Sequence, residues 1–376
     1  MVKSILNDLN DQIKKNKKII NLAIGEPLVS PPGELSEICS QVINEGYTKY
    51  MPTGGDPELI LAIQEKLKKE DLYYKEDEIV VTAGAKPALT AILKVLLGIG
   101  SGVIVPEPFY PPFVGAVQML GGQKILVDTK NDFQLTVEKI QKKLENKRIL
   151  PRVIPRIIII NSPNNPTGSI YSQGELRKIA EFAFEKNLFI ISDETYCDFG
   201  YTEKPLSIAN IGYRDKIIIV RSFSKSYNVP GLRIGYVAGP KRVIKEVKKV
   251  IGTMFGCACS ISQRIAIMLL NNKTYPKNIK SIFFESRGIL LDWLEKNNIP
   301  FVEPQGAFYV FPDFSEIIKT KKFGDSVGLV NALIQNSVAI APGVAFGKNY
   351  TNHARIAFCC SPTTMEKAIK KMNKII

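Results

Sequence analysis

The sequence predicts an α/β protein in which a large domain, with a mostly parallel central sheet flanked by helices, is joined to a smaller α+β domain. Three observations support this fold class. Apolar runs are continuous rather than alternating, which is typical of strands that are buried on both faces of a sheet. Amphipathic helical segments separate these runs along the chain, as expected for helices that cover a parallel sheet. After about residue 275 the regular alternation ends, which indicates a second architecture.

The first expected element is a helix over residues 2–15. A second helix is expected to begin at Pro57, because Asp56 suits the N-cap position and proline is favoured at the first helical position. Apolar runs predict strands at residues 79–81, 103–105, 157–160, 188–191 and 217–220, with a helix from Pro87 after the first of them. A long helix over residues 278–296 and short strands near 307–310 and 354–357 are expected in the last part of the chain.

Composition excludes several classes of protein. The chain has 376 residues, of which 23% are charged and 45% are hydrophobic, as in an ordinary globular protein. No apolar run reaches the ~18 residues that a membrane-spanning helix needs, and the N-terminus has no uninterrupted apolar core of a secretory signal. We therefore expect a cytoplasmic protein with no membrane contact.

The net charge of +14 raises the question of a nucleic-acid partner. The lysines are dispersed, however, and no DNA-binding motif accompanies them, so we expect no nucleic acid. A positive field would still favour anionic substrates and phosphate. The six cysteines form no Cys-x-x-Cys pair and the chain has one histidine, so we expect reduced thiols and no metal site.

Two predicted strand ends hold the residues that point to a chemistry. Lys225 follows the run 217–220, and Asp193 and Tyr196 follow the run 188–191. In an open α/β sheet, ligands bind at the strand ends. A lysine that can form a Schiff base and a carboxylate that can hold a protonated pyridine nitrogen are the minimum for pyridoxal phosphate chemistry. Taken singly, each residue also fits a structural role, such as a solvated lysine or an aspartate that caps a helix.

Further blocks fit the same cofactor, and together they resemble the class I and II aminotransferases, which are fold type I pyridoxal phosphate enzymes. The matching blocks run from Gly25-Glu26-Pro27, through the turn 162–168 and the stretch 222–236, to Arg355. The resemblance implies three parts. An N-terminal segment (1–44) joins the small domain, a large domain (45–275) binds the cofactor, and a small α+β domain (276–376) ends the chain.

The resemblance also implies a role for each residue around pyridoxal 5′-phosphate. Lys225 would form the Schiff base and Asp193 would pair with the pyridine nitrogen, while burial and nearby cations such as Arg233 would lower the pKa of Lys225. Tyr196 and Asn165 would hydrogen-bond the phenolic oxygen, and Tyr110 would stack on the ring. The expected phosphate ligands are the backbone N–H groups of Ala85 and Lys86, the side chains of Ser222, Ser224 and Arg233, and the partner subunit's Tyr50. A site shared in this way implies a homodimer.

For the substrate, Arg355 matches the family arginine that binds the α-carboxylate. A planar guanidinium suits a carboxylate, because it can donate two parallel hydrogen bonds to it. Gly25 would let the backbone approach the same carboxylate, and Asn165 is expected beside it. The stretch 250–262, where acid-specific relatives often carry a second arginine from the partner chain, has no cation here. Lys49 and Arg264 could replace it, and aspartate, alanine, aromatic and broad specificities stay open.

These expectations predict an enzyme, a transaminase that moves an amino group between an L-amino acid and a 2-oxo acid by a ping-pong mechanism, with 2-oxoglutarate as an acceptor. A β-lyase on the same fold is the first alternative, since it would use the same Lys225, Asp193 and Arg355. A non-enzymatic regulatory protein with a vestigial cofactor fold is the second.

Overall fold

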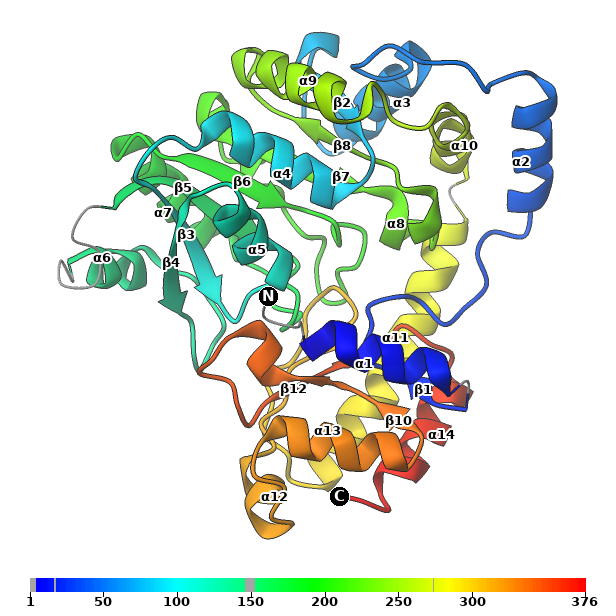
Figure 1. Cartoon of the computed structure of the whole chain (residues 1–376), viewed down its shortest axis with the longest axis vertical. Helices are drawn as coiled ribbons and strands as arrows, with labels where there is room; N and C mark the ends of the chain where they lie inside the picture. The colour runs from blue at the N-terminus through cyan, green and yellow to red at the C-terminus, as the bar shows by residue number, and fades with distance from the viewer. Residues whose placement is uncertain (1–4, 17, 146–152, 273) are drawn as a thin grey trace.

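The structure is a computed structural model that describes residues 5–16, 18–145, 153–272 and 274–376. A seven-stranded sheet forms its larger layer (Figure 1). In spatial order its strands are β2 (Ile79–Thr82), β8 (Gly235–Ala238), β7 (Ile217–Ser222), β6 (Phe189–Asp193), β5 (Ile154–Asn161), β3 (Ser101–Glu107) and β4 (Gln123–Asp128). Strand β8 is antiparallel to both of its neighbours, and the other neighbouring strands are parallel. The predicted, mostly parallel α/β fold is confirmed.

Helices cover both faces of this sheet, which explains why the apolar runs in the sequence are continuous. Along β5, Ile157 and Ile159 belong to one apolar cluster while Ile158 and Ile160 belong to another, and all four are fully buried. The first cluster is completed by α4 (Ala85–Leu96), α5 (Pro111–Met119) and α9 (Lys241–Phe255). The second is completed by α3 (Pro57–Lys68), α6 (Val137–Glu145), α7 (Gln173–Glu185) and α10 (Ser260–Asn271), with α2 (Leu35–Asn44) at its margin.

Two helix starts show how local sequence fixes the elements that matter for the site. Helix α3 begins as predicted, with the side chain of Asp56 accepting a hydrogen bond from the backbone N–H of Glu58. Helix α4 begins at Ala85 rather than at Pro87, and its N-cap residue Gly84 has a φ of 95°. A Cβ at Gly84 would lie 2.5 Å from a terminal nitrogen of Arg233, so glycine is what allows this close approach.

Two smaller sheets lie below the large one in Figure 1. Strands β11 (Ala341–Pro342), β12 (Ala354–Ala357) and β9 (Tyr309–Val310) form an antiparallel sheet, and β1 (Ile20–Asn21) pairs in parallel with β10 (Val338–Ala339). The surrounding helices are α11 (Tyr275–Lys296), α12 (Ser315–Thr320), α13 (Ser326–Gln335) and α14 (Pro362–Met372). The long helix and the short strands that the sequence predicts are therefore confirmed.

The N-terminal segment packs against this C-terminal part. Helix α1 (Ile5–Lys15), blue in Figure 1, lies beside the orange and red elements, and its Leu9 belongs to the same buried cluster as Phe308 and Leu329. The first three residues of the predicted helix 2–15 lie outside the described residues. The boundaries 1–44, 45–275 and 276–376 stay a prediction. In the described ranges, no helix is long and apolar enough to cross a membrane.

Candidate active site

Two adjoining cavities, of about 510 and 520 Å³, lie where the parallel strands end. Asn161, Asp193 and Ser222 are the last residues of β5, β6 and β7, and all three line the first cavity. The two cavities share the lining residues Lys86, Tyr110, Asn165, Tyr196 and Lys225. The strand ends therefore form a binding region, as the sequence predicts.

Lys225 is the lysine on which the predicted chemistry depends. It lies on the short helix α8 (Phe223–Ser226), directly after β7, and its Nζ donates a hydrogen bond to the carbonyl oxygen of Gly25 at 2.6 Å. Burial lowers the pKa of Lys225 to about 8, against the opposing effect of Cys359 and Glu26 and with the help of the positive charges of Arg355 and Lys86. An amine with such a pKa has a sizeable neutral fraction near neutral pH, so it can accept a proton.

Asp193 is a buried carboxyl group with one oxygen held by the protein. Its Oδ1 accepts hydrogen bonds from the backbone N–H of Thr195 at 3.0 Å and from the Thr195 hydroxyl at 2.6 Å. Among the described residues, Oδ2 has no hydrogen-bond partner. Burial raises the pKa of Asp193 to about 6, and the two bonds from Thr195 oppose this rise. A buried carboxylate with an unused oxygen suits a protonated nitrogen as its partner.

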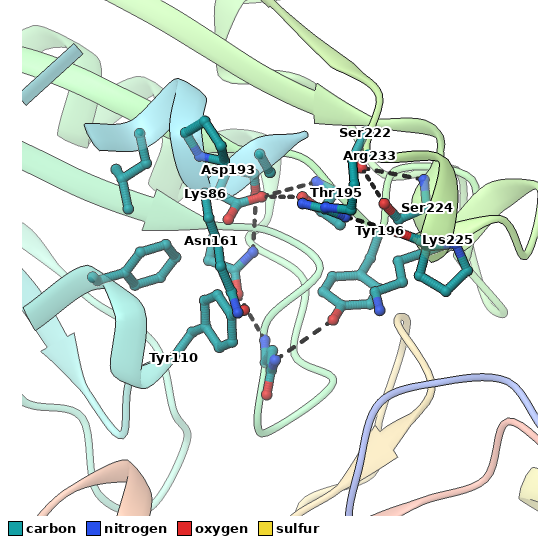
Figure 2. Close-up of a pocket in the computed structure, with 16 residues that line it drawn as sticks. Lys86, Tyr110, Asn161, Asp193, Thr195, Tyr196, Ser222, Ser224, Lys225 and Arg233 are labelled. Atoms are coloured by element: carbon teal, nitrogen blue, oxygen red, sulfur yellow. Dashed lines mark hydrogen bonds between the residues drawn. The ribbon is translucent and has the colours of Figure 1, made fainter. Parts of the chain in front are cut away.

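The opposite side of the cavity is lined by polar and aromatic side chains (Figure 2). The amide nitrogen of Asn165 donates to the hydroxyl of Tyr196 at 3.5 Å, and the backbone N–H of Asn165 donates to Asn161 Oδ1 at 2.7 Å. Asn161 therefore fixes the turn that carries Asn165. The ring of Tyr110 lies edge-on to Phe113, with 5.4 Å between the ring centroids, and Lys86 Nζ is 5.9 Å from the Tyr110 centroid.

Hydrogen-bond donors gather at one end of the first cavity. The N-terminus of α4 brings the backbone of Ala85 and Lys86 there. The hydroxyl groups of Ser222 and Ser224 are 2.9 Å apart. Arg233 Nη1 donates to the carbonyl of Pro230 at 2.8 Å, which anchors its guanidinium beside them. Helix N-terminal N–H groups, two hydroxyls and an arginine are a donor set that suits a phosphate group.

Arg355 lines the second cavity, and its guanidinium is held between two rings. Its Cζ lies 4.4 Å from the ring centroid of Tyr309 and 4.7 Å from that of Phe346. Nη1 donates to Asn165 Oδ1 at 2.8 Å, and Nη2 donates to the carbonyl of Ala23. The Nε group is buried and has no hydrogen-bond partner among the residues that the structure describes. A buried donor that lacks a partner suits an anionic ligand such as a carboxylate.

Taken together, the residues present fit pyridoxal phosphate. Donors for a phosphate lie at one end of the cavity and the unused oxygen of Asp193 lies elsewhere on its wall, with Lys225 and Tyr110 also on its lining. The predicted residues that line the first cavity are Ala85, Lys86, Tyr110, Asn165, Asp193, Tyr196, Ser222, Ser224, Lys225 and Arg233. Gly25 and Arg355 line the second. The structure thus brings all but one of the predicted residues together, while their individual roles stay predictions.

The exception is Tyr50, which is 94% exposed and lines neither cavity in this single chain. Of the two cations considered for the substrate side chain, Arg264 is engaged elsewhere, since it pairs with Asp56 at 2.8 Å and with Glu58 at 2.6 Å. Lys49 lines neither cavity. Neither cation therefore lines the two cavities of the single chain.

Sequence reasoning missed several residues of the site. Asn161 directly follows the predicted strand 157–160, and Thr195 lies between the predicted site residues Asp193 and Tyr196. Their positions could therefore have identified them. Tyr309 lies in an apolar strand, where the pattern indicates only a core residue. Leu6, Leu9 and Asn10 of α1 line the second cavity, and an ordinary amphipathic helix gives no signal of that.

Known proteins resemble this chain both in sequence and in fold. A sequence model of the family described as aminotransferase class I and II matches residues 17–372. The chain is 35% identical over 374 residues to a probable aspartate/prephenate aminotransferase of Aquifex aeolicus, which covers 96% of this chain and 92% of that protein. A double mutant of Thermus thermophilus aspartate aminotransferase matches with a TM-score of 0.91 at 28% identity, covering 100% of this chain and 97% of that one. The aromatic aminotransferase of Pyrococcus horikoshii OT3 matches with a TM-score of 0.87 at 31% identity, covering 98% of each chain.

Proposed function

The chain belongs to the class I and II aminotransferase family and is a pyridoxal phosphate-dependent aminotransferase, and on that premise we propose that it exchanges the amino group between a dicarboxylic L-amino acid and 2-oxoglutarate by a ping-pong mechanism. The general reaction follows from the family. The choice of substrates is our inference from the cavity beside Lys225.

Pyridoxal phosphate, when bound, supplies a ring that withdraws electrons from the Cα of the amino acid attached to it. We assign Lys225 Nζ the task of taking the proton from the substrate Cα, since its pKa of about 8 leaves part of it neutral. We assign Asp193 the task of keeping a ring nitrogen protonated. Arg355 is proposed to bind the substrate α-carboxylate, which fixes the direction in which the Cα–H bond points.

The substrate class rests on one observation, the position of Lys86. Lys86 lines both cavities, and its Nζ lies 5.9 Å from the ring centroid of Tyr110, which also lines both. Lys86 is therefore at the border between the cofactor space and the space around Arg355. Within the described residues, its Nζ has neither a hydrogen-bond acceptor nor an anionic partner. Lys86 is exposed as a whole residue, but partial burial, followed by the charge of Arg233, lowers the pKa of its amine. A second carboxylate on the substrate would be that partner.

Aromatic or broad amino donors are the second candidate. Leu6, Leu9 and Ile24 also line the cavity of Arg355, and together with Tyr110 they offer apolar contact to a ring. The two candidates differ in what they require of Lys86, because only a dicarboxylic substrate needs its charge.

A panel of amino donors, assayed with 2-oxoglutarate and with pyruvate as acceptors, tests the proposal. Lys86→Met should lower kcat/KM for aspartate and glutamate by ~30-fold or more, since a charge-assisted hydrogen bond is worth ~2 kcal/mol, and should leave alanine and phenylalanine within a few-fold. Lys94→Met is the matched control, because Lys94 is likewise exposed on the same helix but lines neither cavity. Equal losses for all donors would contradict the dicarboxylic assignment, and pyruvate release without an acceptor would indicate a β-lyase.

We also propose that the active unit is a homodimer in the cytoplasm. The exposure of Tyr50 supports this, because a largely exposed tyrosine that lines no cavity of its own chain is available to a second copy. Light scattering on the purified protein should give twice the chain mass of 41.8 kDa. A monomer with full activity would contradict a shared site.

A further inference from the structure

Arg355 and Tyr196 are joined by two separate chains of contacts. The first runs through Asn165, which accepts from Arg355 Nη1 at 2.8 Å and donates to the Tyr196 hydroxyl at 3.5 Å. The second runs through Tyr309, whose ring lies 4.4 Å from the Arg355 guanidinium and whose hydroxyl is 2.8 Å from that of Tyr196. Because 3.5 Å is at the outer limit of a hydrogen bond, the Tyr309 path holds Tyr196 more firmly.

Tyr309 is also held in place on its remaining sides. It is 1% exposed, and its ring packs against Phe308 with 4.8 Å between the centroids. Its hydroxyl lies so close to Gly25 that a Cβ there would be 1.7 Å away. The carbonyl of Gly25 in turn accepts the hydrogen bond from Lys225. Tyr309 thus contacts the residue proposed to bind the substrate, a residue proposed to bind the cofactor, and the backbone that holds the catalytic lysine.

A substrate carboxylate adds to the contacts that Arg355 already makes. Each terminal nitrogen of the guanidinium carries two N–H groups and uses one of them, for Asn165 or for the Ala23 carbonyl. The second N–H of each terminal nitrogen, and the Nε group, which has no partner among the described residues, are left for a carboxylate. The same guanidinium lies 4.4 Å from the centroid of the Tyr309 ring. New charge-assisted bonds to this guanidinium therefore act on a closely packed ring whose hydroxyl contacts that of Tyr196.

We propose that Tyr309 is a positioning residue that couples carboxylate binding at Arg355 to the hydrogen bonding of Tyr196. This inference rests on the proposed function, in which Arg355 binds the substrate and Tyr196 contacts the cofactor. Coupling of this kind is reciprocal, so a carboxylate ligand must alter the proton affinity of the bound cofactor, and the proton must alter the affinity for the ligand by the same factor.

Holoenzyme and two probes without an amino group, succinate and 3-phenylpropionate, test the coupling without turnover. The dissociation constant of each probe is measured from the cofactor absorbance, at one pH below and one above the midpoint of the absorbance titration. In the wild type, the dissociation constants of one bound probe at the two pH values should differ by at least ~5-fold. Tyr309→Phe keeps the ring on Arg355 and removes the hydroxyl, and it should lower this ratio by at least ~3-fold.

Phe346→Leu is the matched control, because Phe346 covers the other face of the same guanidinium, 4.7 Å away. It should weaken probe binding at both pH values alike and keep the ratio, with thermal unfolding showing that both variants are folded. An unchanged ratio in Tyr309→Phe, or an equal fall in Phe346→Leu, would overturn the coupling role. If calorimetry shows that a probe binds the wild type but the titration does not move, the coupling is overturned while the proposed role of Arg355 stands. If neither probe binds, the proposed role of Arg355 is wrong, and the inference is overturned with it.

Discussion

The two ends of the candidate site are built in different ways. The cofactor end comprises Asp193, Ser222, Lys225 and the start of α4, all attached to the ends of strands in one sheet. The substrate end comprises Gly25, Tyr309, Arg355 and residues of α1, which come from the first and last parts of the chain. The cofactor end is therefore fixed by the sheet itself, whereas the substrate end exists only when the chain termini pack together.

This difference predicts separable effects of mutation. Changes at the cofactor end should alter the chemistry of every substrate, because each substrate uses the same cofactor. Changes at the substrate end should alter binding and selectivity while the cofactor remains in place.

Replacement of Lys225 should have the largest effect. Lys225→Ala removes the amine that we assign to proton transfer, so the transamination rate should fall by at least ~1,000-fold. In the wild type, borohydride should fix the cofactor on the peptide that contains Lys225, as detected by mass spectrometry. Lys94→Ala should change neither result. Labelling of another lysine would place the cofactor end elsewhere.

Asp193→Ala should separate cofactor binding from catalysis. The phosphate donors near Ser222 and Arg233 do not involve Asp193, so the cofactor should still bind. Without the carboxylate the ring nitrogen loses the anion that keeps it protonated, and the rate of the half-reaction should fall by at least ~100-fold. Single-turnover absorbance measurements give this rate. A rate within a few-fold of the wild type would show that Asp193 does not pair with the ring.

The contrast between the two ends also explains what the sequence could predict. At the cofactor end, a short apolar run followed by a polar residue locates a strand end, so Asp193 and Lys225 were found from local pattern. The continuous runs also predicted the parallel sheet, because both faces of each strand are covered. At the substrate end, Tyr309 was missed because its contacts are with Gly25 and Tyr196, residues far from it in sequence. Arg355 and Gly25 were found only through the family resemblance.

At the substrate end, Arg355→Lys keeps the charge but removes the two parallel hydrogen bonds that a guanidinium can donate to a carboxylate. It also removes the stacking of the planar group between Tyr309 and Phe346. We expect a loss of ~2 kcal/mol or more, which is about 30-fold in kcat/KM, for every amino acid substrate. The absorbance spectrum of the bound cofactor should be retained, unlike the effect at the cofactor end. A loss confined to one substrate would instead place Arg355 at the side chain of that substrate.

The smallest expected effect is a shift in pH dependence from Thr195→Val. The Thr195 hydroxyl donates to Asp193 Oδ1 at 2.6 Å and so favours the ionised carboxylate, whereas burial raises the pKa of Asp193 to about 6. Loss of the hydroxyl leaves only the backbone N–H bond, so the pKa of Asp193 should rise. Because catalysis needs the ionised form, activity should be lost at a higher pH on the acid side, by up to about one pH unit if the bond contributes ~1.5 kcal/mol.

At about pH 8 the same variant should remain within a few-fold of the wild type, since the carboxylate is ionised in both proteins. Thr195→Ser keeps a hydroxyl and should restore the wild-type acid limb, which separates the hydrogen bond from a general packing defect. The half-reaction rate, measured from about pH 5 to pH 9 for the wild type and the two variants, gives the acid limb of each protein.

The phosphate of the cofactor also titrates near pH 6, but it does so in all three proteins. The difference between their pH profiles therefore reports Asp193 alone. Superimposable profiles for Thr195→Val and the wild type would show that the hydroxyl does not tune the carboxylate. The cofactor end would then depend only on the backbone of the strand ends, which would sharpen its contrast with the side-chain network around Arg355.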